Sequence, residues 1–78
     1  MSNEEKREKI IALITEILQV EEGVVTEHTR AEDLEAWDSV AHVMIIGGLE
    51  ELGISIPLDE AVELQGVEDI LRKAGVKS

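Results

Sequence analysis

The apolar residues between positions 3 and 19 are spaced as on one face of a helix, and this spacing most constrains the fold. Isoleucine and leucine follow the i, i+3, i+4, i+7, i+8 template at Ile10, Leu13, Ile14, Ile17 and Leu18, and Ile11 widens the stripe. Asn3 suits the N-cap position, and Glu4 and Glu5 suit the first turn. The opposite face is charged, as in an outer helix of a bundle. We therefore expect an amphipathic helix over residues 3–19.

The remaining patterns are also helical. A second helix is expected over residues 39–52, ended by Gly53. Residues 54–57 read as an extended connector because Pro57 disfavours a paired strand. Asp59 is expected to cap a short helix that reaches about Leu64, and a last helix is expected over residues 67–74. The predicted fold is an all-α, four-helix bundle of three longer helices and one short helix, forming a single domain over residues 1–78.

Residues 20–37 form a long connection between the first two helices. A structureless loop of this length is uncommon in a compact domain unless it is packed or functional. Four apolar residues can hold it against the helices: Val24, Val25, Leu34 and Trp37. A helical turn is expected near residues 31–34, and Trp37 is expected to be a packing anchor.

The charge of the chain limits its partners. The formal net charge is −11, and residues 31–71 contain no Lys or Arg. Such a field repels nucleic acid and anionic lipid and attracts basic protein surfaces. The 44% of apolar residues, at helical spacing, argue against disorder. No apolar run is long enough to span a membrane, and no signal peptide is visible. We expect a cytoplasmic monomer that binds neither nucleic acid nor membrane.

The start of the second helix carries the candidate chemistry. A short polar side chain before an apolar helical run is a typical N-cap, and either Asp38 or Ser39 can fill that role. If Asp38 is the cap, the Ser39 hydroxyl lies in the first turn and faces water. A phosphate attached there would be stabilised by the positive end of the helix dipole.

Asp38-Ser39-Val40 at this position resembles the Asp-Ser-Leu motif of acyl carrier proteins. The resemblance extends over nearly the whole chain: the first helix, the long loop, Leu49-Glu50-Glu51, Ile56-Pro57, Asp59-Glu60-Ala61 and Val67 to Leu71. It implies that Ser39 carries 4′-phosphopantetheine, with Asp38 as part of the flanking motif. It also implies a carrier and not an enzyme, modified by a phosphopantetheinyl transferase that brings coenzyme A and magnesium. A carrier of this kind delivers acyl thioesters to loading and processing enzymes of a fatty-acid, polyketide or other specialised pathway.

The second helix is apolar on two sides. Ile45, Ile46, Leu49 and Leu52 lie on one side, and Val40, Val43, Met44 and Gly47 lie on the other. The first side suits the core, and the second suits an acyl chain or a partner. The predicted partner-binding residues are Val40, Val43, Met44, Glu50 and Glu51, the two acids facing basic partners. Gly47-Gly48 indicates either close helix packing or room for a partner or acyl chain.

Departures from the family pattern bear on the subtype. Fatty-acid carriers usually have acidic residues where this chain has Ala41 and Met44, and the acidic turn after Leu49 is shorter here. The Trp37-Asp38-Ser39 and His42 context is more similar to discrete, free-standing carriers of specialised pathways.

An esterase or a metal site would need residues that this sequence does not provide. Ser39 and His42 share a helix face, but an esterase also requires oxyanion donors, an orienting partner and a cleft. Asp38 and His42 are expected to form a modest surface pair. Asp38, His42 and the distant His28 are too few for a metal site. The alternative function is an acidic helical interaction module that is never modified.

Overall fold

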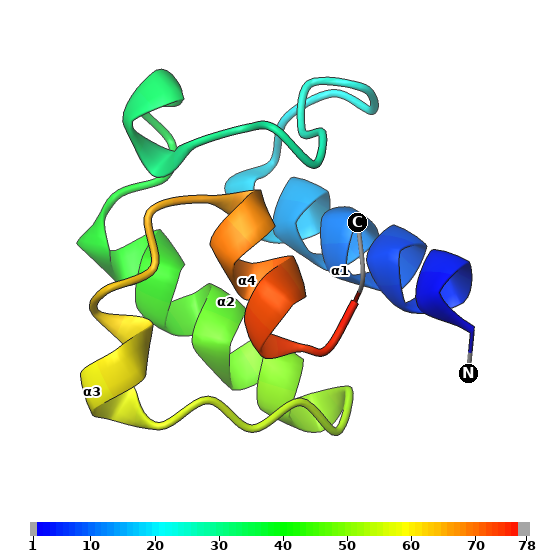
Figure 1. The fold of residues 1–78 in the computed structure, drawn as a ribbon. Coiled ribbons are helices and arrows are strands. Elements are labelled where there is room, and N and C mark those ends of the chain that lie inside the picture. Colours follow the sequence, from blue (N-terminus) through cyan, green and yellow to red (C-terminus); the bar gives the residue numbers. More distant parts are fainter. Residues whose placement is uncertain (1, 77–78) are drawn as a thin grey trace.

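The computed structural model describes residues 2–76, and Met1, Lys77 and Ser78 of the predicted domain lie outside the described residues. The elements are α1 (Asn3–Leu18), the 3₁₀ helix η1 (Ala31–Asp33), α2 (Ser39–Glu51), α3 (Leu58–Ala61) and α4 (Val67–Lys73). Figure 1 shows α1, α2 and α4 packed around a common centre, with α3 beside α2 and the long α1–α2 connection crossing one end. The predicted all-α fold, with three longer helices and one short one, is confirmed.

The N-cap of the first helix lies one residue earlier than expected. Ser2 is the N-cap, because its Oγ accepts a hydrogen bond from the Glu5 N–H at 3.2 Å. The prediction of Asn3 as the cap was therefore wrong, and Asn3 is the first helical residue. At the other end, Gln19 adopts the left-handed conformation, with φ of 55°, and ends the helix.

The short helix α3 differs from its prediction at both ends. Pro57 precedes it, and the Pro57 carbonyl accepts from the N–H groups of Glu60 and Ala61 at 3.0 and 2.8 Å. Asp59 thus lies inside the first turn and is not the cap. Proline suits the cap position because a cap residue donates no N–H bond within the helix, so the missing N–H of the ring costs nothing there. The helix ends at Ala61, and the expected extension to Leu64 is wrong.

The core is built from one face of each longer helix. Six large side chains are less than 2% exposed: Ile10, Ile14, Ile45, Leu49, Val67 and Ile70. Ile54 and Ile56 of the extended connector and Val25 of the long connection complete the cluster. On α2 the predicted core side is correct for Ile45 and Leu49, but Leu52 is 37% exposed and Ala41 is buried instead. Because Leu52 is the C-cap residue, it has already left the helical face.

The two adjacent glycines of α2 have different roles. A Cβ on Gly48 would lie 2.8 Å from Cδ1 of Leu13, so α1 packs directly against the backbone of α2 at this point. A Cβ on Gly47 would meet nothing within 4 Å. Close helix packing therefore explains Gly48, whereas Gly47 lies on the exposed side.

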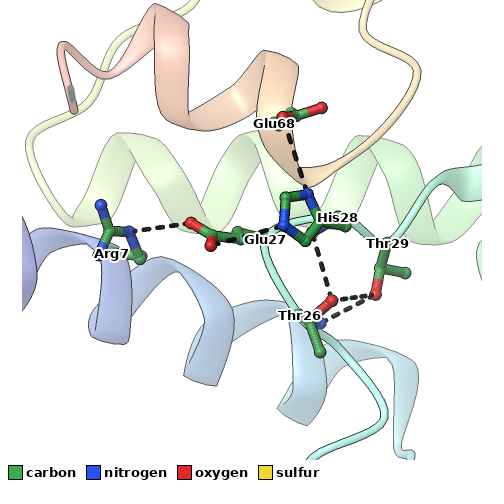
Figure 2. A network of polar contacts seen from close by, with 6 residues as sticks. All are labelled: Arg7, Thr26, Glu27, His28, Thr29 and Glu68. Atoms are coloured by element: carbon green, nitrogen blue, oxygen red, sulfur yellow. Dashed lines mark hydrogen bonds and ion pairs between the residues drawn. The ribbon is translucent and has the colours of Figure 1, made fainter. Parts of the chain in front are cut away.

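Polar contacts hold the long connection against α1 and α4. Figure 2 shows the Glu27 carboxylate facing Arg7 of α1, with Nε and Oε2 3.5 Å apart. His28 lies between Glu27 and Glu68 of α4, at 3.7 and 3.8 Å. Because these charged groups are partly or largely exposed to solvent, their pairing stabilises the fold only modestly. The apolar anchors Val25 and Trp37, 3% and 6% exposed, contribute more.

The apolar anchoring was only partly as expected. Leu34 is partly buried against the core, in agreement with the prediction. Val24 is 42% exposed and does not anchor the loop. The expected turn near residues 31–34 is η1.

The end of the long connection pairs with the segment before α4. Arg30 and Gly66 form an isolated antiparallel bridge. The Ala31 N–H donates to the Gln65 carbonyl at 2.8 Å, and the Val67 N–H donates to the Thr29 carbonyl at 2.9 Å. The connection is therefore fastened to the start of α4 by backbone bonds.

Within residues 2–76, no helix combines the length and the apolar character needed to cross a bilayer.

Candidate functional site

Asp38 is the N-cap of α2. Its Oδ1 accepts a hydrogen bond from the Ala41 N–H at 2.8 Å, and its backbone is extended. The choice between Asp38 and Ser39, which the sequence left open, is therefore settled in favour of Asp38. Such a cap satisfies one of the backbone donors that every helix start leaves without an intrahelical acceptor.

Ser39 is consequently the first residue of the helix, and its side chain is exposed. Its hydroxyl makes no hydrogen bond to another residue of the described part of the chain. The first turn of α2 contains no acidic residue beyond the cap itself. The positive end of a 13-residue helix thus lies next to a free hydroxyl, an arrangement that favours an attached anionic group.

An open hollow of about 380 Å³ lies beside Ser39. Residues from α2, from the long connection and from the segment after α3 line it: Ala31, Trp37, Asp38, Ser39, His42, Val43, Val62 and Leu64. Most of these side chains are apolar, and the titratable ones in the lining are Asp38 and His42. The hollow is shallow and open to solvent, so it offers a surface along which an attached group can lie but no enclosed chamber.

His42 connects three parts of the site. The Trp37 indole Nε1–H donates to His42 Nδ1 at 3.0 Å, and His42 Nε2 lies 2.7 Å from the carbonyl oxygen of Ala61 in α3. The expected surface pair of Asp38 and His42 is therefore wrong, because both ring nitrogens are engaged elsewhere. The reason is tertiary: α3 and Trp37 approach His42 from positions that helix spacing alone does not reveal.

The same contacts argue against an esterase. A general base needs a free ring nitrogen within reach of the serine, and His42 has neither nitrogen free. Within the described part of the chain, no three His, Asp or Glu side chains are grouped to hold a metal ion.

The predicted partner-binding residues of α2 fall into two groups. Val40, Val43 and Met44 are 68%, 65% and 54% exposed, so the second apolar side of the helix does face solvent. Glu50 and Glu51 are also exposed, but they lie about 17 Å from Ser39 along the helix axis, at a rise of about 1.5 Å per residue. The structure therefore places the apolar group near Ser39 and the acidic pair at the far end of α2.

Two exposed residues near α3 were not predicted. Leu58 and Val62 are 72% and 73% exposed, and Val62 lines the hollow together with Val43. The signal was weak, because a short helix with two apolar residues has no clear stripe. We use the name apolar docking surface, as a candidate for partner binding, for the exposed apolar residues Val40, Val43, Met44, Leu58 and Val62.

An ion pair ties α3 to α4. The Lys73 ammonium bonds to the Glu60 carboxylate, which raises the pKa of Lys73 above its ordinary value. The Glu60 carboxylate is therefore part of an ion pair. Together with the His42–Ala61 contact, this pair holds the short helix at both sides.

The chain was compared with protein families, with curated proteins and with solved structures. No family model matches the chain. An acyl carrier protein of Thermosynechococcus vestitus is 44% identical over 91% of this chain and 89% of the relative. One of Rickettsia massiliae is 37% identical over 92% of this chain and 86% of the relative. The solution NMR structure of holo acyl carrier protein from Geobacter metallireducens superposes with a TM-score of 0.75 at 27% identity, covering 88% of this chain and 80% of that one.

The chain belongs to the acyl carrier protein family. The members of this family are carriers and not enzymes, and the chain is classed accordingly. The resemblance noted from Asp38-Ser39-Val40 is thereby confirmed at the level of the family.

Proposed function

We propose that Ser39 is the attachment site of 4′-phosphopantetheine and that this chain carries acyl intermediates as thioesters on that arm. The observation that carries the proposal is the exposed hydroxyl of Ser39 in the first turn of α2, directly after the Asp38 cap. The helix start favours the phosphate of the arm, and the hollow lined by Trp37 and Val62 gives the arm a surface to follow.

The chain itself contains no thiol. When bound, the arm supplies the thiol on which acyl groups are carried. A serine without an adjacent base is a poor nucleophile, so the activation of Ser39 falls to a phosphopantetheinyl transferase, which also brings coenzyme A and magnesium. The chain's own part is to present the hydroxyl and to dock.

The partners we propose are that transferase and the acyl-loading and acyl-processing enzymes of a fatty-acid, polyketide or specialised pathway. The −11 net charge and the exposed Glu50 and Glu51 favour enzymes with basic docking surfaces. The Trp37-Asp38-Ser39 and His42 context supports a discrete carrier, and the net charge of −11 favours a monomer because it disfavours self-association. We place it in the cytoplasm, where such enzymes and coenzyme A would reach it.

The test is intact mass after incubation with coenzyme A, magnesium and a broad-specificity transferase. The native chain is expected to gain one phosphopantetheine, and Ser39→Ala is expected to gain none. Ser55→Ala removes another exposed serine and should load like the native chain. If several transferases leave the native chain unmodified, the carrier function is contradicted, and the alternative function as an unmodified interaction module takes its place.

The apolar docking surface gives a second prediction. Met44→Glu places a charge within that surface, at a side chain that is 54% exposed. We expect weaker transferase binding, seen as a raised KM, and an unchanged melting temperature, because exposed positions are usually within about 0.5 kcal/mol of neutral. Met44→Leu keeps the surface apolar and is the matched control. If the KM of Met44→Glu equals that of the native chain, Met44 is not part of the docking surface.

A further inference from the structure

We propose that His42 is a positioning residue, which in its neutral form ties Trp37 and α3 to the start of α2 and so shapes the hollow beside Ser39. The function of the hollow rests on the proposed role of Ser39, whereas the link itself does not. Its atoms are all part of the described structure: the indole Nε1 of Trp37, both ring nitrogens of His42 and the Ala61 carbonyl oxygen.

The two partners of His42 determine its protonation state. An indole N–H can only donate, so Nδ1 must accept; a carbonyl oxygen can only accept, so Nε2 must carry the proton. The neutral ring with its proton on Nε2 satisfies both contacts at 3.0 and 2.7 Å. A second proton on Nδ1 would place two N–H groups against each other and break the contact with Trp37.

The link joins elements that share few other contacts. Ala61 is the last residue of α3, Trp37 precedes α2, and His42 is within the first turns of α2. Trp37, His42 and Val62 all line the hollow. Breaking the link would therefore move one wall of the hollow relative to Ser39, although Ser39 itself is untouched.

Few titratable side chains line the hollow beside His42. On α2, Asp38 is one turn before His42 and lines the same hollow. On the side of α3 the titratable groups are Asp59, Glu60 and Glu63, and on the connection before Trp37 they are Glu32, Asp33 and Glu35. None of these acids lines the hollow, and Glu60 is paired with Lys73. A second proton on Nδ1 of His42, added by acidification, is therefore the change expected to act on this link.

The first experiment tests the link by spectroscopy. Ring ¹⁵N resonances of His42 should show the proton on Nε2 in the neutral ring, and on acidification the emission of the sole tryptophan should change in step with the His42 resonances. His42→Gln should remove this change. His28→Asn, which removes the other histidine, should retain it, since His28 lies in the separate network of Figure 2. A proton on Nδ1, or emission that does not follow His42, would overturn the link.

The second experiment tests the positioning role. The ratio of the native kcat/KM to the His42→Gln kcat/KM, with one transferase, cancels the pH dependence of the transferase itself. Lowering the pH should reduce this ratio by about three- to tenfold, which is the change that corresponds to the loss of one net hydrogen bond. The reduction should come from a raised KM of the native chain, with its kcat unchanged. A ratio independent of pH would overturn the positioning role. A native chain that is never loaded would instead overturn the proposed function, and the spectroscopic experiment would still decide the link.

Discussion

Replacing Ile45 with alanine is expected to lower the free energy of unfolding by about 2–5 kcal/mol, the range for truncating a buried isoleucine. Ile45 is 0% exposed at the centre of α2, within the cluster formed by Ile10, Ile14 and Ile70. The loss combines the transfer free energy of the removed atoms with the cost of the cavity they leave. For a domain of this size the change is a large part of the total stability.

Urea unfolding, followed by far-ultraviolet circular dichroism, measures the effect of Ile45→Ala. Val43→Ala is the matched control, since Val43 lies on the same helix with 65% of its surface exposed. The control is expected to stay within about 0.5 kcal/mol of the native chain. Equal losses of unfolding free energy in Ile45→Ala and Val43→Ala would contradict the assignment of one side of α2 to the core and the other to solvent.

Gly66→Ala is expected to destabilise the fold by about 1–3 kcal/mol, as for overpacking a tightly filled site. A Cβ at this position would lie 2.7 Å from the Thr29 carbonyl oxygen and 2.9 Å from the Arg30 Cα. Both are backbone atoms, which cannot turn aside as a flexible side chain can. The substitution should therefore separate the bridge that fastens the long connection to α4.

Hydrogen exchange of the Ala31 and Val67 amides measures this effect locally, because these two N–H groups donate across the bridge. Gly47→Ala is the control, since its Cβ would meet nothing within 4 Å inside a helix. That variant should be stabilised by about 0.5–1 kcal/mol, the usual gain over glycine in a helix. Unchanged amide protection in Gly66→Ala would show that the close approach is not required.

The helical spacing was sufficient to predict the elements but not all of their ends. The stripe containing Ile10 and Ile14 is fixed by local periodicity, so α1 was expected and found. The cap of α1 and the start of α3 depend on one or two backbone bonds, and neighbouring polar residues compete for them. Ser2 and Asn3 are equally good caps by type, and only the folded chain shows which one accepts the Glu5 N–H.

The candidate site shows the same division. The start of a helix at Asp38-Ser39 follows from local sequence, because it depends on a single helix. The sequence left both residues as possible caps, and only the folded chain shows that Asp38 accepts the Ala41 N–H. The contacts of His42 do not, since Ala61 is 19 residues away in the sequence. Leu58 and Val62 were missed for a related reason: their place beside α2 is set by how α3 packs and not by their own spacing.

The position of the added mass tests the central claim most directly. After transferase treatment, the intact native chain can be fragmented by a method that keeps phosphoester groups in place, and the fragments that carry the arm can be read along the sequence. The expected result is a single phosphopantetheine on Ser39, with Ser2 and Ser55 unmodified. An arm on any other residue, or no arm at all, would contradict the assignment of Ser39 as the carrier residue.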